Sequence, residues 1–363
     1  MRVVTFGAPG RYVQGPGVLD RLGELTVGLG RRLLVVGDAD VLAILGDRLQ
    51  AAAAPEQALC VLPMQGEVTP AAIAALTAQG REFAADLVAG LGGGKALDAA
   101  KGVAKLLNLG FVSVPTVASN DSPTARAMAI YDESHTLTAI DSLQESPRLV
   151  LADTALIARA PMRFLVAGIG DAVAKKFEAE RAAADGSGNF FDGHATLTSL
   201  AIADACYRTL RAHGVAALQA AREQRTSEAL EAVVEANILM AGLAYENVGL
   251  SYAHAIVRGL VKARGAADAI HGLQVAYATL VQLALEGRED PFIADLMGFY
   301  GEVELPVRLA ELGMPDPTGA EIAEIARLTG MGPAGGRIQV LKSAGEIAGA
   351  INRIEALAAQ VAR

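Results

Sequence analysis

Two histidines and one aspartate in the second half of the chain are residue types that bind catalytic metal ions. His254 lies in GLSYAHAIVRGL, His271 lies in DAIHGLQVAYATL, and Asp171 follows small residues in AGIGDAVAKKFEAE. Two imidazoles and one carboxylate leave an open position on Zn²⁺, as in catalytic zinc sites. A carboxylate among Ala, Val and Phe is costly to bury without a partner, which a metal ion would supply. The simpler alternatives are that each histidine is an ordinary half-exposed side chain and that Asp171 caps a helix after Gly170.

The other three histidines are assigned no chemistry. His135 falls in an expected hairpin, and His194 lies near an expected helix start. His213 precedes Gly214 at an expected helix C-terminus, where a histidine is favoured by the helix dipole.

A glycine cluster, GLGGGKALDAAK over residues 90–101, lies between an expected strand and an expected helix. Glycines there let the backbone approach a pyrophosphate, and the helix N-terminus offers N–H donors. The cluster is not the usual GxGxxG fingerprint, and Ala follows Lys95, so it is not a Walker A loop either. The alternative is a tight turn that binds no ligand.

Asp38 ends the expected strand RLLVVGD over residues 32–38. An acidic residue there can hydrogen-bond ribose hydroxyls and repel a 2′-phosphate, which favours NAD over NADP. Alternatively, Asp38 caps the helix that follows.

The elements that must position these residues fall into two sets. Up to about residue 158, short β-rich runs alternate with helical stretches, which predicts a parallel sheet with helices on both faces. The run 127–140 predicts a hairpin, and Ala-rich amphipathic helices follow from about Pro161. We therefore predict an α/β Rossmann-like domain over residues 1–159 and an all-α domain over residues 160–363.

Composition limits the classes of protein and of partner. The 363 residues are 52% hydrophobic and 20% charged, enough for two domains with buried cores. The net charge of −9 argues against nucleic-acid binding and against docking on an anionic membrane. No apolar run approaches the ~20 residues that span a bilayer. The N-terminal residues lack a signal-peptide pattern, and Cys60 and Cys206 lie outside any CxxC, so we expect a cytoplasmic protein. The Ala- and Leu-rich helices lead us to expect a homo-oligomer.

Together these segments resemble the glycerol dehydrogenase branch of the metal-dependent (iron- or zinc-containing) alcohol dehydrogenase superfamily, which has a dehydroquinate-synthase-like fold. The resemblance covers nearly the whole chain in order. It rests on an opening hairpin and helix (PGRYVQGPGVLDRLGEL), the glycine cluster, PTVASNDSPTARAMAIYDE, GIGDAVAKKFEA, GLSYAHAI and HGLQVAYATLVQL.

The resemblance implies roles for particular residues. Asp171, His254 and His271 would bind the metal, and Asp121 would hydrogen-bond the substrate hydroxyls beside it, in the cleft between the domains. Iron-type members have a third His one helical turn after the Asp; here Lys175 stands there, which favours Zn²⁺, with Fe²⁺ as the alternative. The NAD contacts would be Asp38 at the adenosine ribose, with Gly93, Gly94, Lys95, Asp98, Thr116, Ser119 and Tyr131.

The activity implied is NAD-dependent oxidation of a small polyol, glycerol to dihydroxyacetone, by metal-assisted hydride transfer. The sequence departs from the branch at several positions. Thr124 replaces a Cys, Ala125 replaces a cofactor-binding Ser, Arg126 adds a positive charge, and Leu273-Gln274 replaces Glu-Lys after Gly272. If Arg126 faces the substrate, it favours an anionic one, so the alternative is a 2-oxo acid/2-hydroxy acid or glycerol-1-phosphate oxidoreductase. A non-catalytic nucleotide-binding module is a further alternative, and the complete Asp/His/His set argues against it.

Overall fold

The computed structural model describes residues 2–133, 136–330 and 342–361. The chain divides into two compact units. The sheet unit comprises Gly7–Phe164 and Ala220–Gly242, and the helical unit comprises Met1–Phe6, Leu165–Gln219 and Leu243–Arg363. We expected one boundary, between residues 159 and 160; in the structure the chain passes between the units more than once, because residues 220–242 belong with the sheet.

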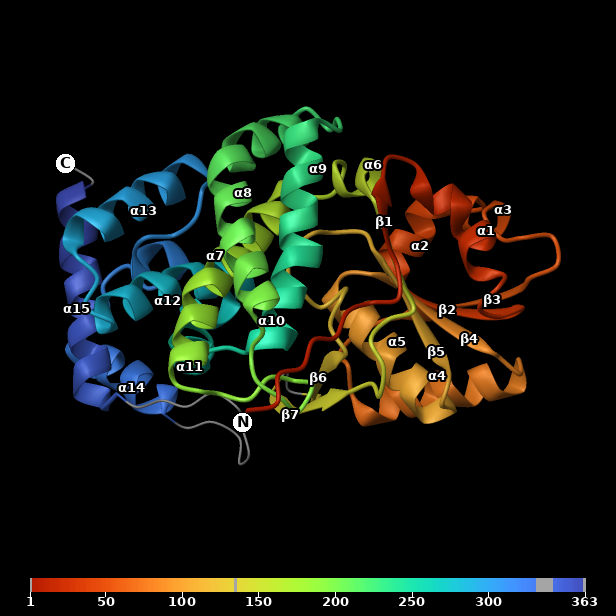
Figure 1. The fold of residues 1–363 in the computed structure, drawn as a ribbon, viewed down its shortest axis with the longest axis horizontal. Helices are drawn as coiled ribbons and strands as arrows, with labels where there is room; N and C mark the ends of the chain where they lie inside the picture. Colours follow the sequence, from red (N-terminus) through yellow and green to blue (C-terminus); the bar gives the residue numbers. More distant parts are fainter. Residues whose placement is uncertain (1, 134–135, 331–341, 362–363) are drawn as a thin grey trace. The chain divides into compact units, whose positions relative to one another are not determined.

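The sheet unit is built on six parallel strands in the order β1-β8-β5-β4-β2-β3 (Figure 1). This confirms the predicted parallel α/β sheet. We expected the first strand to belong to an opening hairpin. In the structure it pairs in parallel with β8, the strand of this sheet that comes last in the sequence. The strands are β1 (Tyr12–Gly15), β2 (Arg32–Asp38), β3 (Ala58–Met64), β4 (Leu87–Gly92), β5 (Gly110–Pro115) and β8 (Leu149–Asp153).

Alternate side chains of β2 enter two different cores. Leu33 and Val35 belong to a cluster with residues of η1, α1, α2 and α3, whereas Leu34 and Val36 belong to a cluster with residues of α4 and α5. Because successive strand residues point to opposite faces, an apolar strand of this kind must be covered by helices on both faces. These helices are η1 (Val18–Arg21), α1 (Leu22–Thr26), α2 (Ala39–Leu45), α3 (Arg48–Ala51), α4 (Pro70–Glu82) and α5 (Gly94–Leu107).

A separate two-stranded antiparallel sheet joins β6 (Ala127–Tyr131) to β7 (Leu137–Ser142). It confirms the hairpin expected over residues 127–140, although His135 lies outside the described residues. The sheet unit also contains α6 (Thr154–Ile157), α9 (Glu228–Glu235) and the π-helix η2 (Ala236–Met240).

The helical unit confirms the predicted Ala-rich helices (Figure 1). In the part of the chain that the structure describes, no helix is long and apolar enough to cross a bilayer. The elements are α7 (Met162–Ala184), α8 (Leu197–Arg222), α10 (Ala241–Val248), α11 (Tyr252–Leu260), η3 (Ala266–Asp268), α12 (His271–Leu285), α13 (Asp290–Glu302), η4 (Leu309–Leu312), α14 (Gly319–Thr329) and α15 (Ala344–Val361).

Two histidine placements can be compared with the structure. His194 forms a β-bridge with Val4 shortly before α8, which confirms its expected place near a helix start. His213 lies inside α8, so the helix end expected at Gly214 is wrong. Gly214 serves packing instead, because a Cβ there would lie 3.2 Å from a Val303 methyl carbon.

Candidate functional site

Three helices of the helical unit bring Asp171, His254 and His271 together. Asp171 lies well inside α7, so it does not cap that helix, whereas His254 lies in α11 and His271 is the first residue of α12. Small residues allow the close approach of α7 and α12. A Cβ on Gly272 would lie 1.9 Å from the carbonyl oxygen of Ala167, and one on Gly170 would lie 2.4 Å from the carbonyl oxygen of Gly272.

The three side chains form a compact cluster of potential metal ligands. Each offers one ligand atom, and these atoms all lie within 4.8 Å of one another. His254 Nε2 lies 3.4 Å from Asp171 Oδ1, and the two imidazole rings have centroids 5.4 Å apart. Asp171 is buried, His254 is half-buried and His271 is exposed, so one side of the cluster is accessible to a small ligand.

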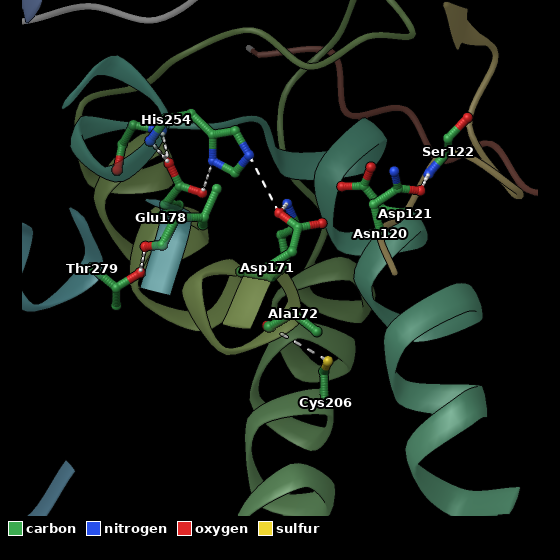
Figure 2. A network of polar contacts seen from close by, with 12 residues as sticks. Asn120, Asp121, Ser122, Asp171, Ala172, Glu178, Cys206, His254 and Thr279 are labelled. Carbon is green, nitrogen blue, oxygen red and sulfur yellow. Dashed lines mark hydrogen bonds and ion pairs between the residues drawn. The ribbon is translucent and has the colours of Figure 1, made fainter. Parts of the chain in front are cut away.

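A second carboxylate, Glu178, fixes the orientation of His254 (Figure 2). His254 Nδ1 lies 2.7 Å from Glu178 Oε2, while Glu178 Oε1 accepts hydrogen bonds from the backbone N–H groups of Ser251 and His254. A carboxylate on one ring nitrogen leaves the other nitrogen free to bind a metal and raises its basicity. Nε2, the nitrogen that faces Asp171, is therefore the one available to a metal.

Charge interactions hold Asp171 and His254 in their ionised forms, whereas burial lowers the pKa of His271 to about 4. Burial opposes a charged imidazole, but the carboxylates of Glu178 and Asp171 outweigh it and raise the pKa of His254 to about 9. Burial likewise opposes the charged form of Asp171, but Lys175 and His254 keep the pKa of that carboxyl below its usual value. This concentration of shifted groups is typical of a functional site.

Lys175 lies one helical turn after Asp171 and reaches back to it. Its Nζ donates to Asp171 Oδ1 at 3.0 Å, and both side chains are almost completely buried. Lys175 Nζ also lies 5.6 Å from the centre of the Tyr245 ring. A positive charge is therefore built into the wall of the cluster.

The donor set of this cluster fits a divalent metal. Two imidazoles and a carboxylate would supply three ligands to a catalytic metal ion and leave one coordination position open for substrate. Glu178 hydrogen-bonds the ring nitrogen of His254 that would not bind the metal. Metal-binding histidines generally have such a partner, which fixes the orientation of the ring.

In the sheet unit, the glycine cluster and Asp38 meet at one end of the sheet. The strand order reverses between β2 and β4, since β3 lies on one side of β2 and β4 on the other. Ligands of open α/β sheets bind beyond the carboxyl ends of the strands at such a reversal. Asp38 ends β2, and the glycine turn after β4 leads directly into α5.

The glycines of the turn after β4 stand where a larger residue would crowd neighbouring side chains. Gly92 has φ 144°, and a Cβ there would lie 2.8 Å from the Cβ of Asp38; one on Gly94 would lie 3.1 Å from Asn120 Nδ2. Gly93 is the N-cap of the 14-residue helix α5, whose N-terminal N–H groups suit an anionic group. Thr116 donates its backbone N–H to Gly92, and its Oγ1 is buried without a hydrogen-bond partner. The turn therefore fits a dinucleotide pyrophosphate.

Three of the predicted cofactor contacts also have structural partners. Asp38 accepts from the backbone N–H groups of Asp40 and Val41, so the capping role that we considered is realised. Lys95 is exposed and pairs with Glu67. Asp98 accepts from Lys101 Nζ at 3.0 Å and from the backbone N–H of Ala129 at 2.9 Å. Whether these side chains also bind NAD stays a prediction.

Lys101 organises the loop that contains Ser119 and Asp121. This ammonium is completely buried, and it donates to Asp98, to the Oγ and carbonyl oxygen of Ser122, and to the carbonyl oxygen of Ala127. Asn120 accepts from the backbone N–H of Ser122 (Figure 2). Ser119 and Asp121 are half-buried in this loop, within the sheet unit.

The same loop is held from the other side by residues 236–242. Asn237 donates to the carbonyl oxygen of Ala118 at 3.1 Å, and Thr124 donates to that of Ile238 at 2.9 Å. A Cβ on Gly242 would lie 1.7 Å from Thr124 Oγ1. The loop is thus fixed by a segment more than a hundred residues away in the sequence.

Tyr131 and Arg126 lie on the hairpin. Burial, with Asp98 and Glu67, raises the pKa of the half-buried Tyr131, so its hydroxyl stays neutral. Arg126 donates to the carbonyl oxygen of Gln144. Gln144 lines a surface cavity of about 260 Å³ with Asn108, at the opposite end of α5 from the glycine turn. Whether Arg126 also faces the substrate stays a prediction.

Sequence reasoning missed Glu178, Lys101 and Asn237 as supporting residues. A signal for Glu178 exists, because Asp171, Lys175 and Glu178 follow at helical spacing on the face of α7 that is otherwise made of small and apolar residues. Lys101 lies in the quoted glycine-cluster motif, but nothing in its spacing indicates burial. Asn237 has no local signal.

Comparisons with known proteins agree with this architecture. Residues 9–154 match the family model described as iron-containing alcohol dehydrogenase. A glycerol dehydrogenase of Pseudomonas putida is 35% identical over 322 residues, 88% of each chain. A glycolaldehyde reductase of Halobacterium salinarum is 37% identical over 324 residues, 89% of this chain and 88% of that protein. The solved glycerol dehydrogenase of Schizosaccharomyces pombe has a TM-score of 0.93 at 32% identity and covers 99% of this chain and 92% of that one.

The fold, the cluster of metal-ligand residues and the similarity to known proteins together identify this protein as a metal-dependent alcohol dehydrogenase. Within that class, the chain belongs to the glycerol dehydrogenase branch of the iron-containing alcohol dehydrogenase superfamily.

Proposed function

We propose that this protein oxidises glycerol to dihydroxyacetone with NAD and a divalent metal, and that Zn²⁺ is the metal. The main support is the Asp171, His254 and His271 cluster, in which Glu178 directs the free ring nitrogen of His254 toward Asp171. Relatives that are named glycerol dehydrogenases and are about as long as this chain support the substrate.

A divalent ion in this cluster would act as a Lewis acid toward the substrate hydroxyl and make it easier to deprotonate. The chain's own residues have three tasks. Glu178 holds His254 in one orientation, the glycine turn binds the pyrophosphate, and Asp121 orients the neighbouring substrate hydroxyl. A bound NAD would accept the hydride of the carbinol carbon, and the task of the chain is to hold substrate and nicotinamide within near-attack distance.

For the cofactor, we propose NAD rather than NADP. Asp38 stands beside the glycine turn, where its carboxylate would accept from the ribose hydroxyls and repel a 2′-phosphate. The roles of Lys95, Asp98, Thr116, Ser119 and Tyr131 as cofactor contacts belong to this proposal. Cys60 and Cys206 form no disulfide, which suits the cytoplasm, where we place the enzyme.

A second candidate is the reduction of a hydroxyaldehyde. The relative from Halobacterium salinarum, 37% identical, is named a glycolaldehyde reductase. Glycolaldehyde shares with dihydroxyacetone a carbonyl beside a hydroxyl, so one site could accept both. A 2-hydroxy acid stays the alternative substrate, toward which Arg126 would supply a positive charge.

The first experiment measures NADH formation with glycerol, 1,2-propanediol and 2-hydroxybutyrate, and NADH consumption with glycolaldehyde. Each assay is repeated after chelation and after Zn²⁺ is restored. We expect turnover with the two diols that is lost on chelation and regained with Zn²⁺. Turnover only with glycolaldehyde or only with the acid would transfer the assignment to that substrate class.

The matched variant is Asp171→Asn, which keeps the shape of the side chain and removes a ligand charge. We expect it to lose zinc and activity while the helical circular dichroism stays unchanged. A variant that keeps both zinc and turnover would refute the ligand assignment.

A further inference from the structure

Lys175 places a buried positive charge where a metal ion would add two more. Its side chain is 1% exposed, and its Nζ lies 3.0 Å from Asp171 Oδ1. The same carboxylate oxygen lies 3.4 Å from His254 Nε2, the ring nitrogen that Glu178 leaves available. The ammonium therefore contacts the side of the carboxylate that faces the other ligands.

The neighbouring residue, Lys176, has a different environment. Lys176 turns toward the surface, where it pairs with Asp204 and Glu180, and its side chain is 20% exposed. The sequence thus places two lysines next to each other, one at the protein surface and one inside the ligand cluster. A cation in the low-dielectric interior repels a nearby metal ion much more strongly than one in water does.

A buried aspartate without a counter-charge would be strongly destabilising. Lys175 supplies that counter-charge through its hydrogen bond to Asp171. When a metal binds, the ion and the ammonium interact with the same carboxylate, and their positive charges repel each other.

We infer that Lys175 is an internal counter-ion for Asp171, which stabilises the metal-free protein and weakens metal binding so that the metal exchanges readily. This rests on the metal centre of the proposed function. In this inference the Lys175 ammonium competes with the metal ion for the carboxylate of Asp171. Removal of the lysine charge therefore tightens zinc binding and lowers the stability of the protein without zinc.

The opposite effect is the expected one for an ordinary supporting residue. Outer partners that orient a ligand usually strengthen metal binding, and their loss weakens it about 10- to 100-fold. The sign of the change in zinc affinity therefore separates a competing counter-ion from an orienting partner.

The experiment compares the wild-type protein with Lys175→Gln, Lys175→Met and Lys176→Gln. Gln keeps a donor for Asp171 without the charge, Met removes both at similar length, and Lys176→Gln makes the same change in net charge at the surface. The zinc dissociation constant of each is measured by competition with a chromogenic chelator, without substrate or cofactor. Thermal unfolding is recorded with and without zinc.

We expect both Lys175 variants to bind zinc about tenfold more tightly or more, and Lys176→Gln to match the wild type. We also expect the metal-free Lys175 variants to unfold at lower temperature and zinc to restore them. Lys175 variants that fold only with zinc would support the inference in the same way.

Unchanged or weaker zinc binding in Lys175→Gln would overturn the inference, as would equal tightening in Lys176→Gln. So would Lys175 variants that stay unfolded even with zinc, because a counter-ion is dispensable once the metal is bound. Absence of zinc binding by the wild-type protein would overturn both the inference and the metal centre. Zinc binding as expected without turnover of any alcohol would instead contradict only the proposed function.

Discussion

Single side chains in this protein often serve the fold and the candidate site together. Asp38 is the N-cap of α2 and also stands beside the glycine turn. Glu178 accepts from the first backbone N–H groups near the start of α11 and also orients His254. Substitutions that keep one role and remove the other are therefore the informative ones.

For Asp38, the informative substitution is Asn, which caps a helix about as well as Asp but has no charge. We expect Asp38→Asn to lower the preference for NAD over NADP about tenfold, since about 1.4 kcal/mol of repulsion corresponds to that factor. The thermal unfolding temperature should stay unchanged. The measurement is kcat/KM for each cofactor.

The control is Asp40→Asn, because Asp40 lies in the first turn of the same helix. Its cofactor preference should equal that of the wild type. If Asp38→Asn also leaves the preference unchanged, Asp38 is a helix cap only.

At the scale of elements, glycine contacts between helices decide where the ligands stand. α12 begins at His271, and Gly272 directly after it lies against the backbone of α7 at Ala167. The position of His271 relative to Asp171 thus depends on a contact between two backbones rather than between side chains.

Gly272→Ala should therefore destabilise the protein by about 1–3 kcal/mol, as overpacking of a filled interior does. It should also weaken zinc binding, because α12 must move away from α7. Urea unfolding and chelator competition measure the two effects.

The matched control is Gly298→Ala in α13, where a Cβ would meet nothing within 4 Å. This substitution should stabilise the helix by up to about 1 kcal/mol and leave zinc affinity unchanged. Equal effects of both substitutions would show that the α7–α12 contact does not position His271.

At the scale of the whole molecule, the two candidate sites are built from different units. Asp171, His254 and His271 belong to the helical unit, whereas Asp38, the glycine turn and Thr116 belong to the sheet unit. Each site is thus completed by the hydrogen bonds and packing of its own unit.

Chelation should consequently abolish alcohol oxidation without abolishing binding of the nucleotide. We expect the dissociation constant of NADH, followed by its fluorescence, to change less than about threefold on metal removal and in Asp171→Asn. A loss of NADH binding on chelation would mean that the metal also organises the nucleotide site.

Much of this organisation could be predicted from the sequence because its signals are local. Strand–helix alternation, the turn before α5 and the hairpin of β6 and β7 each depend on neighbouring residues. Asp171, His254 and His271 were identified by residue type and by family resemblance, and the structure brings them together.

The remainder depends on contacts between distant segments, which have no local pattern. Nothing in the sequence around Lys101 distinguishes it from a surface lysine. In the structure it is completely buried, and its ammonium donates four hydrogen bonds. The π-helix η2 was expected as ordinary helix, and its contact with the loop after β5 cannot be inferred from either segment alone. Residues 220–242 belong to the sheet unit because of contacts with distant segments, so their place could not be predicted from the sequence either.

The place of residues 220–242 in the sheet unit has a consequence for how such a protein can be recombined. A chimera with one crossover near residue 160 would combine the sheet of one parent with the Asn237 and Gly242 segment of the other. The contacts of that segment with Ala118 and Thr124 would then join two sequences that have never been selected together. Exchange of the whole sheet unit between two parents therefore needs four crossovers, after residues 6, 164, 219 and 242, so that residues 220–242 are exchanged with the sheet.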